Sequence, residues 1–510
     1  MRETPHLLRD SPRGGMRART ALPRLGRTAP PFVRSRAASC PPRRRAIPYR
    51  RRAARGAGRT AMARTDEIID RAQQAADAFR RFNQPQTDAI VHAACRAAIE
   101  RRFELARLAH AETGIGIERD KALKNLIASQ FVCEDIRGLQ TVGVVRRDDA
   151  NGITEIVQPV GPVLGLTPVT NPTSTAIFKC LICLKTRNPL IISPHMAAKR
   201  CTVAAAQVCY EAALAAGAPA DCIQWLAKPT PKAAGELMSH RGVALIIATG
   251  TSGLVRTAQS SGAPVLGVGP GNVPACVTSS ADAQRTAALV MESKTFDNGT
   301  VCASEQALVV ERPIAGDIKR ELCAVGAHFM TSEQAGRVAA FAYDAETRSM
   351  SAAVVGRSVA EIAQRCGIDV APDARLLVAA LDAVGSEAPL SAEILAPILA
   401  WYVEDDFDAC VRRCEQITRF GGVGHTAVIH TGDAAQVETF ARRVDVARIL
   451  VNTPATHGAL GGTWNALDSS FTLACGGAAR NINADNITAR HLLQTQRIAR
   501  PRRHPAWESA

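Results

Sequence analysis

One cysteine in a polar loop is a candidate nucleophile. Cys302 lies in the segment FDNGTVCASEQ (296–306), directly before a β-prone run, Ala307–Glu311. A loop that leads into a strand exposes its thiol, and a thiolate can attack an electrophilic carbon to form a covalent intermediate. A lone cysteine is, however, more often a small core residue. This segment alone leaves both catalysis and packing open.

Two turns that follow β-prone runs carry groups suited to binding. Asn171 precedes Pro172, and an Asn-Pro pair after a strand is typical of a simple turn that leaves a side-chain amide at the end of the strand. The segment Thr249-Gly250-Thr251 follows a buried run and precedes a helical pattern. The free N–H groups at the start of a helix suit a pyrophosphate, but the pattern is weakly specific.

The remaining cysteines do not indicate a metal centre. The chain has 15 cysteines, an odd number scattered mostly through apolar segments, which argues against a secreted disulfide framework and favours a reducing cytoplasm. Cys180 with Cys183 and Cys410 with Cys414 have ligand-like spacing, but each pair lies in a helical pattern without nearby histidines. We therefore interpret both pairs as packed helix faces and predict no metal site.

Alternating strand and helix patterns position these candidate residues. Residues 63–111 read as two amphipathic helices, and an Asn-Gly turn predicts a hairpin over 141–158. Strands alternating with helices then predict a parallel sheet with right-handed crossovers. The predicted strands are Val163–Leu166, Leu190–Ser193, Ile223–Leu226 and Val243–Ala248, and the predicted helices are Ser174–Cys183, Ala197–Ala216, Pro231–His240 and Leu254–Ser260.

The predicted fold class is α/β, with two Rossmann-like parallel-sheet domains and a β-hairpin for oligomerisation. The proposed boundaries are 62–268 for a dinucleotide-binding domain that includes the hairpin, 269–445 for a catalytic domain with Cys302, and 446–510 for a returning segment and C-terminal tail. We expect the hairpin to pair subunits in a homodimer or homotetramer.

The basic charge of the chain is confined to residues 1–61. This leader holds 17 arginines and no lysine against two acids, Glu3 and Asp10, so it accounts for the whole formal net charge of +15. It is predicted to be disordered, because it lacks an apolar run and a helical period. A transit peptide, an RNA-binding tail and an over-extended gene start at Met62 all remain open, the last being favoured.

Several long motifs, in order, closely resemble those of coenzyme A-acylating aldehyde dehydrogenases, including the acetaldehyde and sulfoacetaldehyde enzymes and the aldehyde domain of bifunctional aldehyde-alcohol dehydrogenases. The motifs are FDNGTVCASEQ, TNPTSTAIFKCLICLKTRNPLIISPH, VGPGN and ARILVNTPATHGALGG. The resemblance covers about residues 64–497. It implies an aldehyde dehydrogenase-like fold, NAD or NADP as oxidant, and coenzyme A and a small aldehyde as substrates.

The resemblance implies a role for each candidate residue. Cys302 would be the nucleophile, and Asn171 with the Cys302 N–H would stabilise the oxyanion. Glu393 matches the glutamate that holds the nicotinamide ribose. The Ser193-Pro194-His195 stretch lacks the lysine that hydrolytic relatives place on the adenosine ribose, which leaves NAD and NADP open. The full predicted dinucleotide site is Thr170, Ser193, Pro194, His195, Thr249, Gly250, Thr251, Gly267, Val268 and Glu393.

Two further positions bear on the reaction. Gly267 stands where hydrolytic relatives carry a general-base glutamate, so a thioester is expected to persist until a thiol attacks it. His425 belongs to a GGVGHT motif of the acylating branch and is a candidate for assisting thiol deprotonation.

The C-terminal segment departs from the acylating pattern. Relatives read Cys-Gly-Ser-Trp-Gly-Gly-Asn, whereas this chain reads CGGAARN over 475–481. An aromatic residue is replaced by Ala478, and Arg480 adds a cation. The arginine either binds an anionic aldehyde, such as sulfoacetaldehyde or succinate semialdehyde, or faces solvent or another subunit.

Two rival functions were weighed against acylation. A hydrolytic aldehyde dehydrogenase that releases free acid is disfavoured by Gly267. A nucleic-acid-binding protein is disfavoured because residues 62–510 carry no basic excess. No apolar run approaches the roughly 20 residues of a membrane helix, so we expect a cytoplasmic enzyme with neither membrane nor nucleic-acid partners.

Overall fold

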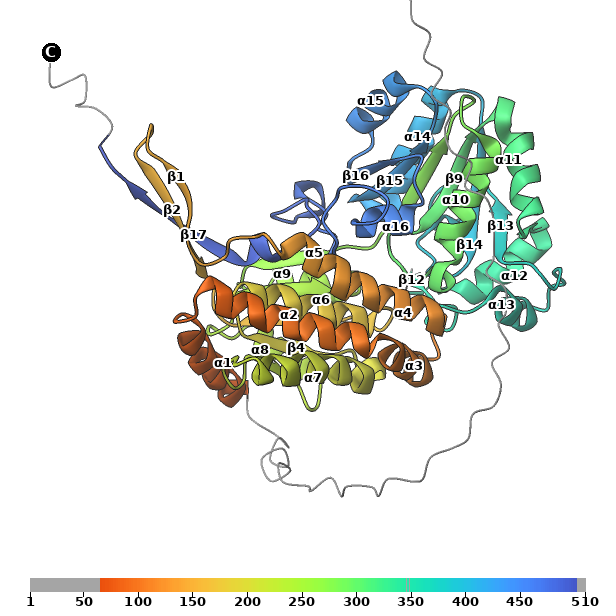
Figure 1. Ribbon diagram of the computed structural model, residues 1–510. Coiled ribbons are helices and arrows are strands. Elements are labelled where there is room, and N and C mark those ends of the chain that lie inside the picture. The colour runs from red at the N-terminus through yellow and green to blue at the C-terminus, as the bar shows by residue number, and fades with distance from the viewer. Residues whose placement is uncertain (1–64, 345, 348, 502–510) are drawn as a thin grey trace, which may run out of the picture. The chain divides into compact units, whose positions relative to one another are not determined.

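A computed structural model describes residues 65–501, apart from 345 and 348 (Figure 1). The predicted leader, 1–61, lies outside the described residues. In the described part, no helix is both long enough and apolar enough to cross a membrane.

Three helices, where the sequence predicted two, open the described chain. They are α1 (Thr65–Phe79), α2 (Gln84–Glu100) and α3 (Arg102–Thr113). Asn83 separates the first two, because its side chain accepts from the Gln86 N–H and the Gln86 side chain accepts from the Asn83 N–H, a capping box that starts a new helix. A single residue, Arg101, separates α2 from α3. The helical spacing of apolar residues continues across Arg101, so the sequence pattern does not indicate that one helix ends there and another begins.

The next helices lead into the first sheet. They are α4 (Glu118–Leu126), the π-helical turn η2 (Ile127–Phe131) and α5 (Val132–Ile136). The first sheet is parallel, with strand order β5-β4-β3-β6-β7. Its strands are β3 (Val163–Leu166), β4 (Leu190–Ser193), β5 (Ile223–Trp225), β6 (Leu245–Thr249) and β7 (Val265–Val268). The crossovers contain α6 (Pro172–Lys185), η3 (Met196–Ala198), α7 (Lys199–Ala215), α8 (Pro231–Met238) and α9 (Ser252–Gln259).

The order of this sheet has a functional consequence. The chain builds outward from β3 to β4 and β5, then returns to the other side of β3 with β6 and β7. The strand order therefore reverses between β3 and β6. Crevices at the carboxyl ends of such strands are where open α/β sheets bind ligands.

The second sheet is also parallel and has seven strands, in the order β10-β13-β14-β9-β8-β15-β16. They are β8 (Val273–Val277), β9 (Glu305–Glu311), β10 (Ala327–Phe329), β13 (Leu376–Ala380), β14 (Ile398–Glu404), β15 (Gly424–His430) and β16 (Val446–Val451). The sheet extends one strand past residue 445, where the sequence placed the end of this domain, because β16 pairs with β15 along its length.

Helices and short elements connect the strands of the second sheet. The helices are α10 (Ala283–Thr295), α11 (Arg312–Ala324), α12 (Ser332–Ala342), α13 (Val359–Cys366), α14 (Phe407–Ile417), α15 (Ala434–Arg443) and α16 (Ala455–Leu460). The short elements are η4 (Phe296–Gly299), the two-stranded pair β11 (Tyr343–Asp344) and β12 (Ser349–Met350), η5 (Pro389–Ser391) and the π-helical turn η6 (Thr418–Gly422).

The predicted hairpin is present and gains a third strand that the sequence did not predict. β1 (Gly143–Asp148) and β2 (Ile153–Pro159) pair antiparallel, and β17 (Leu493–Ala499) pairs with the other edge of β2. The chain reaches β17 through η7 (Gly477–Ala479) and η8 (Ala489–Leu492). Figure 1 shows this three-stranded sheet standing apart from both parallel sheets. The predicted α/β class, with two parallel sheets and a small antiparallel element, is confirmed.

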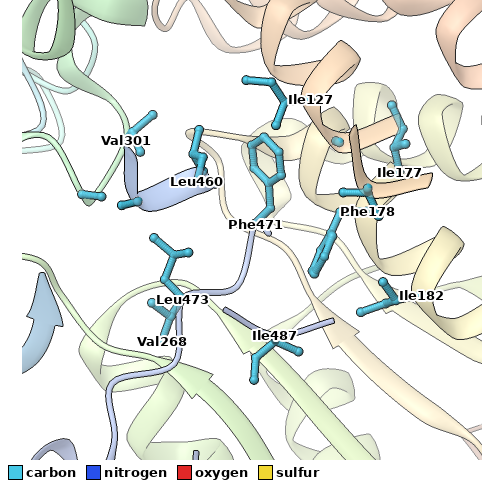
Figure 2. Packing of buried hydrophobic residues seen from close by; sticks show 14 of the residues in the cluster. Ile127, Ile177, Phe178, Ile182, Val268, Val301, Leu460, Phe471, Leu473 and Ile487 are labelled. Carbon is cyan, nitrogen blue, oxygen red and sulfur yellow. The ribbon is translucent and has the colours of Figure 1, made fainter. Parts of the chain in front are cut away.

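Buried apolar side chains from both sheets meet beneath the candidate site. Figure 2 shows the C-terminal residues Phe471 and Leu473 between residues of α6 and the segment around Val301, which precedes Cys302. Phe178 of α6 packs on Phe471 with ring centroids 6.4 Å apart. The returning chain thus joins the two sheets in one core.

The cysteine pairs with ligand-like spacing are packed helix faces, as predicted. Cys180 and Cys183 are buried on α6, while Cys410 and Cys414 on α14 are buried in one apolar cluster with Cys276 of β8.

Candidate active site

Cys302 lies in a short turn between η4 and β9, and its side chain is half-buried. The Ser304 N–H donates to the Val301 carbonyl at 2.9 Å, which closes this turn. Gly271 passes directly against it, because a Cβ built there would lie 1.9 Å from the Cys302 carbonyl oxygen. Only glycine allows so close an approach of the two backbones.

The thiol is uncharged at neutral pH. Burial raises the pKa of Cys302 to about 12, with further increases from the Glu393 carboxylate and the Cys475 thiol, while Arg448 opposes them. The thiol therefore needs a base or an added cation before it can attack a carbonyl. Glu393, Cys475 and Arg448 are thus charged or titratable groups that act on the nucleophile.

Asn171 reaches the same site from the other sheet. It occupies the N-cap position of α6, just beyond β3. Its Nδ2 donates to Thr170 Oγ1 at 3.1 Å and lies 3.5 Å from the carbonyl oxygen of Thr300, two residues before Cys302. The structure thus places the predicted oxyanion donor beside the nucleophile loop.

A buried ionic cluster that the sequence analysis did not predict supports this junction. Asp297 is fully buried, and its carboxylate pairs with Lys121 at 3.1 Å and Lys124 at 2.5 Å. Lys124 also donates to Asn171 Oδ1 at 2.7 Å. Both lysines come from α4, three positions apart, which puts them on one helix face. That spacing, on a helix otherwise rich in charge, is the only sequence signal for the cluster.

His425, from the GGVGHT motif, is the second residue of β15 and is fully buried. Its Nδ1 lies 3.0 Å from Thr426 Oγ1, while Nε2 has no hydrogen-bond partner. Its Cε1 would be 3.3 Å from a Cβ on Gly271, so the ring packs beside the Cys302 turn. Burial, with a contribution from Arg448, lowers the pKa of His425 to about 3, which keeps the imidazole neutral.

Arg448 ties the C-terminal segment to the site. It is buried on β16, and its guanidinium donates to the His425 carbonyl at 2.8 Å, to Asn486 Oδ1 at 2.6 Å and to the Ala474 carbonyl. The Ala474 bond fixes the residue before Cys475. The Arg448 cation lowers the pKa of Cys302. Its role was not predicted, although it lies in the ARILVNTPATHG motif.

Glu393 follows η5 and faces the site from the catalytic sheet. Its Oε1 accepts from the Gly271 N–H at 3.1 Å. Burial raises the pKa of Glu393 to about 7, while the Gly271 hydrogen bond and Lys294 oppose the shift. The resemblance implies that this acid binds the nicotinamide ribose. Because Gly271 lies against the Cys302 turn, the contact with Gly271 also brings Glu393 close to the nucleophile.

The predicted dinucleotide residues line one edge of the five-stranded sheet. The parallel register aligns Ser193, Leu166, Ala248 and Gly267 across four strands, at their carboxyl ends. Thr249 pairs with Val268 one step further on. This edge coincides with the reversal of strand order between β3 and β6, so it fits a dinucleotide.

Neighbouring groups at this edge differ in exposure. Ser193, Pro194, Thr249 and Thr170 are buried, whereas His195 is exposed. Thr251 is exposed and caps α9, because its side chain accepts from the Leu254 N–H. A helix that begins directly after β6 suits the binding of a pyrophosphate.

The segment that departs from the acylating pattern also borders this edge. Asn481 is buried, its Oδ1 has no hydrogen-bond partner, and that oxygen would lie 3.2 Å from a Cβ on Gly267. Arg480 is exposed in a left-handed conformation with φ 59°, and its carbonyl accepts from Gln259. The loop therefore lies at the site, with the arginine on its open side.

Within the described residues, no group of three or more His, Cys, Asp or Glu side chains is placed to hold a metal ion.

Comparison with known proteins agrees with this geometry. A sequence model described as "Aldehyde dehydrogenase family" matches residues 46–465. The chain belongs to the aldehyde dehydrogenase family.

The similar proteins include an aldehyde-alcohol dehydrogenase, an acylating dehydrogenase and an acetylating aldehyde dehydrogenase. Aldehyde-alcohol dehydrogenase 2 of Entamoeba histolytica is 40% identical over 451 residues, which are 87% of this chain and 52% of that protein. Sulfoacetaldehyde dehydrogenase (acylating) of Cupriavidus necator is 36% identical, covering 85% of this chain and 88% of that one. The crystal structure of an acetylating aldehyde dehydrogenase from Geobacillus thermoglucosidasius has a TM-score of 0.84 and 41% identity, covering 86% of this chain and 97% of that chain.

The chain spans about half the length of the aldehyde-alcohol dehydrogenases that it matches, at 52% of the Entamoeba protein.

Proposed function

We propose that this protein oxidises a small aldehyde to its acyl-CoA with NAD or NADP as hydride acceptor, through a thioester on Cys302. The observation that carries the proposal is the meeting of three parts from different elements. The Asn171 amide beyond β3 lies 3.5 Å from the Thr300 carbonyl, two residues before Cys302. The Cys302 turn lies against Gly271, four residues after Gly267 at the sheet edge that fits a dinucleotide.

The residues of this chain have distinct tasks in the proposed reaction. The Cys302 thiolate adds to the aldehyde carbon, and the Asn171 amide with the Cys302 N–H stabilises the resulting oxyanion. A bound nicotinamide supplies the hydride acceptor. Glu393, whose carboxylate accepts from the Gly271 N–H, would accept a hydrogen bond from a hydroxyl of the nicotinamide ribose.

Coenzyme A is favoured over water as acyl acceptor because Gly267 offers no carboxylate. Glu393, an acid that acts electrostatically on Cys302, is engaged with the backbone N–H of Gly271. His425, whose Nε2 has no hydrogen-bond partner, is the candidate for assisting deprotonation of the incoming thiol, and because burial lowers its pKa to about 3 it can do so only as a weak base. The name of the Cupriavidus relative, an acylating dehydrogenase, supports the same acceptor.

The aldehyde is either acetaldehyde-like or anionic, and Arg480 separates these alternatives. If the exposed guanidinium binds a sulfonate or carboxylate, Arg480→Ala raises the KM for sulfoacetaldehyde or succinate semialdehyde by about tenfold or more. The KM for acetaldehyde stays unchanged. Equal effects on charged and neutral aldehydes would assign Arg480 to the solvent or to another subunit.

Subunit pairing through the three-stranded sheet is part of the proposal. β1 and β17 both leave an unpaired edge and are mostly exposed. Val144, Val145 and Ile498 are exposed on them. Such edges favour pairing with a second copy, which suits a homodimer or homotetramer.

The test is product analysis of the purified protein with a small aldehyde panel. Without CoA, one equivalent of NADH per site is expected in a single burst, because the thioester accumulates on Cys302. Adding CoA is expected to give continuous turnover and acyl-CoA. Cys302→Ala provides the baseline.

Steady NADH formation without CoA, with free acid as the stoichiometric product, would contradict acylation and establish the hydrolytic alternative. Gly267→Glu is a poor test of that alternative. A Cβ there already meets Val255 Cγ1 at 3.0 Å and Asn481 Oδ1 at 3.2 Å, so a larger side chain would displace the site.

A further inference from the structure

Lys124 links the oxyanion donor to the nucleophile loop through one buried ammonium group. Its Nζ donates to Asn171 Oδ1 at 2.7 Å, to Asp297 Oδ2 at 2.5 Å and to Thr300 Oγ1 at 2.8 Å. Asn171 belongs to the five-stranded sheet side of the site, whereas Asp297 and Thr300 belong to the turn that delivers Cys302. One side chain from α4 therefore holds both halves of the site.

The three contacts use the full capacity of the ammonium group. A protonated lysine has three N–H donors and no acceptor, and here each donor has one oxygen partner. A neutral amine has only two donors, so it would leave one of the three oxygens facing a lone pair. The observed arrangement needs the charged lysine.

The charge is retained at neutral pH. Burial lowers the pKa of Lys124 to about 8, with Lys121 acting in the same direction, while Asp297 and Asp120 oppose the shift. Burial, with a smaller contribution from the Lys124 charge, lowers the pKa of His457 of α16 to about 4, so this imidazole stays neutral.

The contact with Asn171 has a direct chemical consequence. An amide whose oxygen accepts from a cation is polarised, and its N–H groups become stronger donors, because linked hydrogen bonds in a low-dielectric site reinforce one another. The bond to Oδ1 also fixes which end of the amide is the donor, so that Nδ2 is the end turned toward Thr300.

We propose that Lys124 is a positioning residue for the oxidation step: it orients and polarises the Asn171 amide as oxyanion donor and locks that amide to the Cys302 turn. The inference rests on the proposed function, since it assumes that Asn171 stabilises the oxyanion. The three hydrogen bonds of the Lys124 ammonium go to Asn171, Asp297 and Thr300. Lys124 therefore acts on the reaction through these residues and not by contact with the thiol.

Lys121 provides a matched control on the same helix. It is equally buried and also pairs with Asp297, at 3.1 Å, but its other bond is to the Thr170 carbonyl and not to Asn171. Lys121→Met and Lys124→Met each remove one buried ammonium and leave Asp297 with the other. A general loss of packing or charge balance affects both variants alike.

The experiment is a double-mutant cycle on the single-turnover NADH burst. Lys124→Met and Lys121→Met are each made in the wild-type and in the Asn171→Ala background. The dinucleotide dissociation constant reports folding of the site, and iodoacetamide alkylation of Cys302 reports the nucleophile. Lys124→Gln, which keeps length and a neutral donor, serves if the methionine variant does not fold.

The expected result is selective. Lys124→Met slows the burst by about 10- to 100-fold, and Lys121→Met by less than about threefold. Cys302 alkylation and dinucleotide affinity stay within about twofold of wild type in both. In the Asn171→Ala background, Lys124→Met adds less than about threefold, because its effect passes through the missing amide.

Other outcomes separate the two proposals. The positioning role would be overturned if Asn171→Ala slows the burst and Lys124→Met slows it further by its full factor. It would also be overturned if the two lysine variants lose burst rate equally. Either result leaves the proposed function intact. A normal burst in Asn171→Ala alone would instead remove Asn171 from the oxyanion site, and the inference would fall with that assignment.

Discussion

Arg448→Met tests whether the C-terminal segment and the nucleophile form one energetic unit. Only 5% of the surface of Arg448 is exposed. Its guanidinium donates to Asn486 Oδ1, to the His425 carbonyl and to the Ala474 carbonyl. Longer contacts reach the carbonyls of Ala484 and Asp485, at 3.3 and 3.4 Å. Methionine preserves the apolar stem and removes every donor.

The magnitude follows from the acceptors that lose their partner. A buried acceptor left without a donor costs about 1–3 kcal/mol, and three acceptors lie closest to the guanidinium. Removing a buried cation also removes its own desolvation cost, which offsets part of this loss. We therefore expect the free energy of unfolding to fall by about 2–4 kcal/mol.

The assay combines stability with nucleophile reactivity. Urea unfolding followed by tryptophan fluorescence gives the midpoint, and Arg490→Met is the control. Arg490 forms an ion pair with Asp468 at 2.5 Å, but its side chain is 56% exposed, so its loss should cost less than about 1 kcal/mol. Because Arg448 lowers the pKa of Cys302, alkylation of Cys302 by iodoacetamide should also be slower in Arg448→Met and unchanged in the control.

A single result would refute this reasoning. If Arg448→Met unfolds at the same urea concentration as Arg490→Met and alkylates at the wild-type rate, the buried guanidinium neither organises the segment nor influences the thiol.

Three further predictions concern the nucleophile and the cofactor acid. Cys302→Ala should abolish aldehyde oxidation and retain dinucleotide binding; turnover above about one per cent of wild type in a steady-state NADH assay would remove it from the role of nucleophile. Without dinucleotide, Cys302 alkylation should rise about tenfold per pH unit between pH 7 and 10 with no plateau, because its pKa is raised to about 12 and only the thiolate reacts. Dinucleotide affinity should strengthen as pH rises through about 7, where Glu393 becomes the stronger acceptor as a carboxylate, and calorimetric titration of Glu393→Gln should show no such dependence.

The alternating part of the fold was predictable because its strands are buried on both faces. β3 and β4 lie where the apolar runs predicted them, at Val163–Leu166 and Leu190–Ser193. The N-terminal helices were less predictable, since the break at Arg101 interrupts neither the composition nor the period. The pairing of β17 with β2 joins residues more than 300 positions apart, and no local pattern reports such a contact.

The residues of the site likewise fall into those that the sequence predicts and those that only the fold brings together. Cys302, Asn171, Glu393 and Gly267 were found because motifs carry them, and the structure brings all four to one region. Lys124 lies in none of these motifs, and Asp297, although it is the second residue of FDNGTVCASEQ, received no predicted role. Their importance comes from burial, and a helix segment as charged as ERDKALKNL reads as solvent-exposed until the tertiary fold covers it.

The turn before the nucleophile shows how sequence, strain and the buried cluster depend on one another. Asp297, Asn298 and Gly299 all have positive φ, at 49°, 53° and 70°. A left-handed residue other than glycine costs roughly 1–2 kcal/mol, and Asp and Asn are the side chains that tolerate it best. The Asp-Asn-Gly order is thus the one that lets three left-handed residues follow each other.

The cost of this turn is offset by the contacts of Asp297. Its carboxylate accepts from the Ile117 N–H at 2.6 Å and from both buried lysines, while its N–H donates to Asp120 at 2.8 Å. The carboxylate is held as an anion, because Lys124 and Lys121 lower the pKa of Asp297 against the effect of burial. The same ion cluster that orients Asn171 therefore stabilises the strained turn that presents Cys302, so the nucleophile and its oxyanion donor are fixed by one set of charges.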